Sequence, residues 1–83
     1  MSDKMRVKVK VFATLVHHVP NAVSAVPFEV ELAESARVDD LVAQLKLPVE
    51  DVKLVFVNGR ARPPEWVLQP GDELGIFPPV GGG

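Results

Sequence analysis

The residues with the clearest chemical potential stand at the end of the sequence, in the run Pro78-Pro79-Val80-Gly81-Gly82-Gly83. Because glycine has no Cβ, such a segment can enter a channel too narrow for other residues and bring its carboxylate to a nucleotide in a partner's pocket. The two prolines favour an extended backbone that directs the segment away from the body. The carboxylate of Gly83 is therefore the candidate reactive group. A frayed end or a simple linker is the alternative that the glycines alone leave open.

Two pairs of adjacent residues, one of histidines and one of aspartates, also have side chains that can take part in catalysis or bind a metal. His17 and His18 are adjacent, so their side chains diverge in a strand or helix, and no third ligand accompanies them in the sequence. We expect them in a solvated loop and expect no metal site. Asp39 and Asp40 open a predicted helix, where acidic residues favour the helix dipole, so we expect a structural role for them.

Composition indicates one small folded domain. The chain has 83 residues, of which 47% are hydrophobic and 24% charged, which is ordinary for a packed globular protein. So short a chain has little room for a deep active site. It contains no cysteine, which excludes a disulfide, a thiolate nucleophile and a cysteine-based zinc site.

The net charge and the distribution of apolar residues indicate which classes of partner to expect. The formal net charge is −2, which gives no electrostatic case for nucleic acid and favours a basic protein surface. No apolar run approaches the roughly 20 residues that span a bilayer, and the first residues show no apolar signal segment. We therefore expect a cytoplasmic protein that binds neither nucleic acid nor membrane.

The first half of the chain predicts a hairpin followed by a helix. Residues 6–12 and 28–32 alternate polar and apolar side chains, which is typical of strands with one buried face. We expect Glu29 and Glu31 to pair with Lys8 and Lys10, and residues 13–26 to form a broad loop with a helical turn. In residues 38–45 apolar side chains recur at helical spacing, with Ser35 as the candidate N-cap.

The second half predicts two more strands and an irregular crossing. Residues 53–57 read as a strand that Asn58-Gly59 ends with a turn. Pro63 and Pro64 exclude a central strand, and Trp66 after them is expected to cover the edge of the core. A last strand covers residues 73–77. The predicted fold is α+β: a mixed sheet of about four to five strands packed on one main helix, with the opposite face open to solvent.

Three phenylalanines are predicted on that open face. If the alternating valines, leucine and isoleucine of the strands point inward, Phe12, Phe56 and Phe77 point outward. Clustered exposed aromatic side chains on a small protein usually mark a binding surface. The alternative is that a one-residue shift in register buries the rings in the core.

Over nearly its whole length the sequence resembles the MoaD/ThiS family of small sulfur carriers. The resemblance rests on Leu68-Gln69-Pro70-Gly71-Asp72, on the run from Phe77 to Gly83, on residues 7–15 and 38–42, and on Val57-Asn58-Gly59. It implies a ubiquitin-like β-grasp domain over residues 1–77 and a flexible tail over residues 78–83.

The resemblance also implies a chemistry. A partner activating enzyme would use ATP and Mg²⁺ to adenylate Gly83, and a sulfur donor would then displace AMP to leave a thiocarboxylate. Gly82 and Gly81 would accompany it, Val80, Pro79 and Pro78 would form the stem, and Phe12, Phe56 and Phe77 would bind the partner. The chain would bind no cofactor and would not be an enzyme by itself. It would serve as the small subunit of a molybdopterin synthase-type sulfurtransferase, with the large subunit or another sulfur acceptor enzyme as its second partner.

The sequence leaves open which pathway receives the sulfur and whether the protein is a sulfur carrier at all. The Phe-Pro-Pro stem and the Phe12-Ala13 start favour molybdopterin biosynthesis, whereas the short segment over residues 47–52 is more like the thiamine-pathway carrier. Gly81 stands where the molybdopterin branch often has another small residue. Sulfur delivery to thiamine thiazole or to tRNA is the alternative within the chemistry. A ubiquitin-like modifier of lysines and an inert interaction domain are the alternatives of another class.

Overall fold

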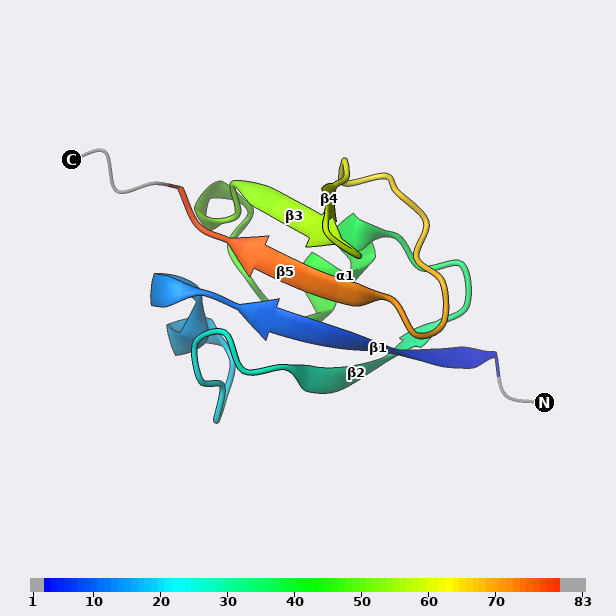
Figure 1. Ribbon diagram of the computed structural model, residues 1–83, viewed down its shortest axis with the longest axis horizontal. Coiled ribbons are helices and arrows are strands. Elements are labelled where there is room, and N and C mark those ends of the chain that lie inside the picture. The colour runs from blue at the N-terminus through cyan, green and yellow to red at the C-terminus, as the bar shows by residue number, and fades with distance from the viewer. Residues whose placement is uncertain (1–2, 80–83) are drawn as a thin grey trace.

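A five-stranded mixed sheet packs one face against a single α-helix in the computed structural model, which describes residues 3–79 (Figure 1). This arrangement confirms the predicted α+β, β-grasp architecture. The elements, in chain order, are β1 (Lys4–Val11), the 3₁₀ helix η1 (Ala13–His18), β2 (Phe28–Ala33), α1 (Val38–Gln44), the 3₁₀ helix η2 (Val49–Asp51), β3 (Leu54–Val57), β4 (Arg60–Ala61) and β5 (Glu73–Phe77).

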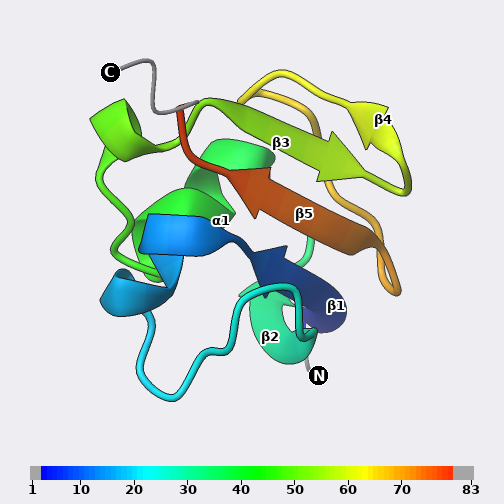
Figure 2. The ribbon, with the colours of Figure 1, turned by 60° about the vertical axis from the view of Figure 1, so that its left-hand side comes forward.

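The strand order is β2-β1-β5-β3-β4, so the first and last strands lie at the centre. β1 pairs antiparallel with β2 and parallel with β5, while β5 pairs antiparallel with β3. Figure 2 shows α1 on one side of these strands, with the other side uncovered. None of the helices within residues 3–79 has the length and apolarity needed to cross a membrane.

The buried side of the sheet follows the predicted alternation. Val7, Val9 and Val11 are buried along β1, and Leu74 and Ile76 along β5. They pack against the apolar side of α1, where Leu41 is fully buried. Because successive strand residues point to opposite faces, the residues between them lie on the open face.

The predicted charge pairing in the hairpin is half right. Lys8 lies opposite Glu29 as expected, but Arg6 lies opposite Glu31. Lys10 lies beyond β2 and is paired with Gly75 of β5 instead. The pairing of Lys10 with a glutamate is therefore wrong, because the antiparallel register that sets Lys8 opposite Glu29 sets Arg6 opposite Glu31 and leaves Lys10 past the first residue of β2, Phe28.

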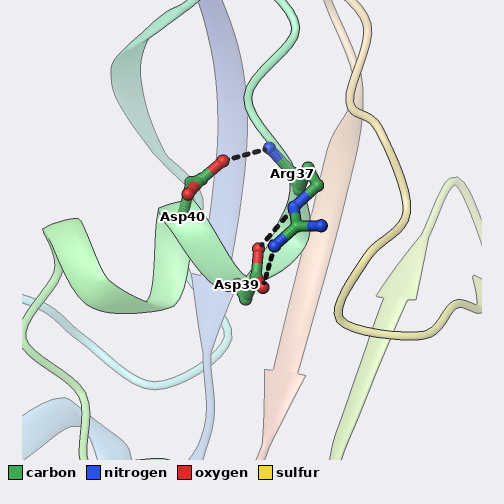
Figure 3. Close-up of polar contacts among 3 residues, drawn as sticks. All are labelled: Arg37, Asp39 and Asp40. Carbon is green, nitrogen blue, oxygen red and sulfur yellow. Dashed lines mark hydrogen bonds and ion pairs between the residues drawn. The ribbon is translucent and has the colours of Figure 1, made fainter.

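The start of α1 differs from the prediction in its cap. Arg37, not Ser35, is the N-cap residue, and its backbone N–H donates to Asp40 Oδ2 at 2.8 Å (Figure 3). The guanidinium of Arg37 donates to both carboxylate oxygens of Asp39, at 2.7 and 3.1 Å. Ser35 has a φ of 70° in the preceding turn, so its side chain is not placed to cap the helix.

A polar cluster joins the turn after β3 to the start of β5. Asn58 and Gly59 have φ values of 53° and 87°, as a tight β3–β4 hairpin turn requires. Asp72 is only 8% exposed and accepts hydrogen bonds from Asn58 Nδ2 at 2.9 Å and from the Gln69 N–H at 2.8 Å. Asn58 Oδ1 accepts in turn from the Glu73 N–H at 3.0 Å. This cluster fixes where β5 begins.

Residues 62–66 form the irregular crossing that the prolines predicted. Trp66 does not join the buried core there. It is 37% exposed, and its ring lies against the guanidinium of Arg62, with 3.9 Å from Cζ to the ring centroid. The ring is therefore a cation–π partner for Arg62 rather than the expected cover over the core edge.

Candidate functional site: an aromatic patch beside the stem

Three phenylalanines from three segments meet on the open face of the sheet. Phe12 follows β1, Phe56 lies in β3 and Phe77 ends β5, and all three are half-buried. The rings of Phe12 and Phe77 stack, with 4.2 Å between centroids and 8° between planes. Phe56 meets Phe77 edge to face at 5.5 Å. These three residues are the aromatic patch, and their predicted outward orientation is confirmed.

Gly75 allows the aromatic patch to lie close to the sheet. A Cβ at this position would lie 3.3 Å from Phe77 Cε1, which is tighter than most Cβ contacts, and 3.5 Å from Phe12 Cε1, which is ordinary van der Waals contact. The result is a hollow of about 300 Å³ beside the rings, with Lys10, Asn58 and Glu73 among its lining residues. Sequence reasoning missed Gly75, although a glycine inside a strand is a known signal of close approach by another group.

The stem leaves the sheet directly beside the patch. The Phe77 carbonyl accepts from the Lys53 N–H at 2.8 Å, and the Ile76 carbonyl accepts from the Phe12 N–H at 3.2 Å, so β5 is held on both sides up to its last residue. Pro78 is half-buried and Pro79 exposed. The remaining predicted residues, Val80, Gly81, Gly82 and Gly83, lie outside the described residues. A partner seated on the patch would therefore meet the stem at once.

The histidine and aspartate pairs noted in the sequence make contacts of an ordinary structural kind. His18 Nε2 lies 3.6 Å from Asp51 Oδ2 on the surface. Within residues 3–79, no cluster of three histidine or acidic residues could hold a metal ion. Asp39 and Asp40 hold the first turn of α1, which confirms the structural role expected for them.

Comparisons with known proteins agree with this fold. The sequence model of the ThiS family matches residues 9–83. The structure of a protein described as molybdopterin converting factor subunit 1 of Pyrococcus furiosus is 34% identical, with 92% of this chain and 99% of that chain covered and a TM-score of 0.71. No curated protein matches the chain.

Two more distant structures share the fold. Small archaeal modifier protein 1 of Haloferax volcanii is 24% identical, with 92% of this chain and 99% of that chain covered and a TM-score of 0.72. In a complex of subunits 1 and 2 of the molybdopterin-converting factor from Helicobacter pylori 26695, the similar chain is 20% identical, with 95% of this chain and 100% of that chain covered and a TM-score of 0.60. The match over residues 9–83 and the 34% identity together establish that the chain belongs to the ThiS family of ubiquitin-like MoaD/ThiS sulfur carriers.

Proposed function

We propose that the protein carries sulfur as a thiocarboxylate on Gly83 and donates it in molybdopterin biosynthesis. The observation that most supports this is the aromatic patch at the base of the stem, because it joins a docking surface to the segment that would bear the reactive group. Membership in the ThiS family and the 34% identity to a molybdopterin converting factor subunit 1 support the chemistry and the pathway.

The proposed chemistry needs two steps, both in a partner's pocket. A carboxylate oxygen of Gly83 attacks the α-phosphorus of ATP, and pyrophosphate leaves to give an acyl-adenylate. Hydrosulfide then attacks the carbonyl carbon, and AMP leaves with the oxygen it shares with that carbon. The carboxylate is a poor acyl donor by itself, and the mixed anhydride supplies the leaving group. The chain has no cysteine to hold sulfur, so in this scheme the sulfur travels as the thiocarboxylate itself.

Because the domain is small, most of the catalytic groups would belong to a partner enzyme. Mg²⁺, phosphate-binding groups and acid–base groups would come from an ATP-dependent activating enzyme, and the protein would act as a non-catalytic subunit. Residues 78–83 can span about 20 Å when fully extended, which is enough to enter a partner's active site from a body docked at the patch. Because activation consumes ATP, we propose that the protein acts in the cytoplasm.

We propose a large molybdopterin synthase subunit as the second partner. The complex of subunits 1 and 2 in the Helicobacter pylori structure supports this pairing, because its similar chain has the same fold. The aromatic patch would be buried in that interface, since half-exposed aromatic side chains in a cluster are typical anchors of protein complexes.

Intact-mass measurement tests the proposal. The full chain is incubated with ATP, Mg²⁺, sulfide and a ThiS-family activating enzyme from the same genome. We expect the mass gain of one oxygen replaced by sulfur, localised by fragmentation to Gly83. Deletion of Gly83 should abolish the gain, whereas Val23→Ala, at an exposed position in the loop between η1 and β2, should leave it unchanged. An unchanged mass with an active enzyme would refute the proposal.

A ubiquitin-like modifier is the second candidate, favoured by the fold shared with small archaeal modifier protein 1. In that case a lysine amine rather than hydrosulfide would attack the acyl-adenylate and form an isopeptide bond. Adding cell extract to the same reaction separates the two, because a modifier appears in covalent adducts on other proteins.

A further inference from the structure

A second cavity lies on the helix side of the sheet, where α1, η2 and β3 meet residues 62–64. Its volume is about 180 Å³. Apolar side chains dominate the wall, among them Val42, Leu47, Val49 and Val52, with Lys53 and Arg62 beside them. It shares no lining residue with the hollow at the aromatic patch. Figure 2 shows α1 on the side of the sheet to which this cavity belongs.

The size of the cavity favours one side chain over a small-molecule ligand. Pockets for small ligands usually measure about 300–1,000 Å³, whereas a cavity of about 150 Å³ accepts a molecule as small as benzene. At about 180 Å³ this cavity fits a single leucine or phenylalanine side chain. Val49 at its edge is 79% exposed, so apolar surface continues outward from the opening. Protein segments commonly bind by placing single apolar side chains into pockets of this kind.

The charged side chains at the cavity indicate which charge a partner should have. Lys53 and Arg62 form no ion pair with any of residues 3–79, and Arg62 Nε is buried without a hydrogen-bond acceptor. The ring of Trp66 holds the Arg62 guanidinium in place. The one carboxylate in the wall, Asp39, is already paired with Arg37 at 2.7 Å. The lining thus has two cationic side chains without an ion pair among the described residues, on a chain whose net charge is −2, and these two side chains complement acidic groups.

We propose that this cavity, the α1–β3 cavity, is a second docking site, for a partner protein segment with one leucine or phenylalanine flanked by acidic residues. The apolar side chain fills the cavity, and carboxylates beside it bond to Lys53 and Arg62. Because the cavity and the aromatic patch lie on opposite sides of the sheet, such a segment can hold the protein while the patch and the stem are engaged elsewhere.

A short peptide probes the site directly. The probe is an acetylated, amidated peptide with one leucine between two pairs of glutamates, titrated into the full chain carrying ¹³C-labelled valine and leucine methyl groups. We expect the methyl signals of Val42, Leu47 and Val52 to shift and those of Val7, which lies in the central strand β1 and outside the cavity lining, to stay. Replacing the leucine by alanine, or the glutamates by lysines, should weaken binding by about tenfold or more.

Two variants at exposed positions localise the binding. Val49→Asp and Lys53→Glu should each weaken binding by about tenfold, because they place a negative charge at the opening without disturbing the core. Val23→Asp, at a position 61% exposed, is the matched control and should bind like the unaltered protein.

Four results would overturn the docking site. The first is that the cavity methyl groups do not shift when the peptide is added, and the second is that the lysine peptide binds as well as the glutamate peptide. The third is that removing residues 80–83, without any peptide, causes the same shifts. The fourth is that the protein associates with itself and that Val49→Asp abolishes this association. The third would assign the cavity to this chain's own end, and the fourth to a second copy. Thiocarboxylate formation, measured in parallel, fails or succeeds independently of this binding.

Discussion

At the scale of single residues, Asp72 shows that a conspicuous polar position can serve structure rather than chemistry. In the run from Leu68 to Asp72, Leu68 is buried in the core, Gly71 takes a φ of 85°, and the Asp72 carboxylate accepts two hydrogen bonds. Each residue type is therefore explained by its own burial, backbone conformation or hydrogen bonds. Together they place the start of β5, and so place Phe77 at its end.

We predict that Asp72→Ala destabilises the protein by about 2–4 kcal/mol, because the carboxylate is buried and hydrogen bonds to a charged group are among the stronger ones. Urea denaturation followed by Trp66 fluorescence measures the change. Asp51→Ala is the control, since Asp51 lies 3.6 Å from His18 at the surface and should change stability by less than about 1 kcal/mol. Equal effects of the two substitutions would contradict this role for Asp72.

Gly75 is the residue whose importance appears only in three dimensions. Its missing side chain leaves room for the rings of Phe77 and Phe12 over the strand. The sequence places the three phenylalanines on one face, but the shape of the hollow depends on this glycine.

At the scale of elements, α1 begins through a contact of Asp40 with the backbone. Its carboxylate accepts from the Arg37 N–H, a donor that the helix itself leaves without a partner. Asp39 instead pairs with the Arg37 side chain at the surface. Two adjacent acids of the same charge thus make different contributions to the same helix end.

Asp40→Ala should lower the free energy of unfolding by about 1 kcal/mol, the usual contribution of a hydrogen bond that caps a helix start. Asp39→Ala removes the same charge from the same turn, so it is a matched control, and it should cost less than about 0.5 kcal/mol because exposed ion pairs contribute little. Thermal unfolding by circular dichroism compares the two. A larger effect at Asp39 would show that the side-chain pair, and not the backbone contact, stabilises the helix start.

At the scale of the whole molecule, the sheet separates two surfaces. One face packs against α1 and forms the core, and the other presents the aromatic patch next to the stem. A small domain can therefore present aromatic side chains on one face without taking them from its core.

This separation predicts that binding and stability respond differently at Phe77, the ring that contacts both other members of the patch. Phe77→Ala should weaken binding to the proposed large subunit by about tenfold or more, as loss of an interface anchor does, while the protein remains folded. Titration calorimetry and a thermal melt measure the two properties. Val23→Ala is the control, and unchanged affinity in Phe77→Ala would remove the patch from the interface.

The sequence by itself determined the four longer strands, the helix α1 and the alternation of strand side chains between the two faces of the sheet. Alternation along residues 6–12 and 73–77, helical spacing over residues 38–45 and the Asn58-Gly59 turn are local patterns, because they depend on backbone geometry and on neighbours a few residues away. They were enough to predict a mixed sheet with one helix on one face and the outward direction of Phe12, Phe56 and Phe77, while the β-grasp fold itself was predicted from the resemblance to the MoaD/ThiS family.

Only the tertiary structure decided which distant residues meet. The position of Lys10 opposite Gly75, the bond between Asn58 and Asp72 and the choice of Arg37 as the N-cap all depend on register and packing summed over the fold. No local pattern encodes such contacts, because each is one of many pairings that the same alternation allows. The hollow beside Gly75 and the α1–β3 cavity arise for the same reason: they are spaces left between elements after packing, and no single element contains them.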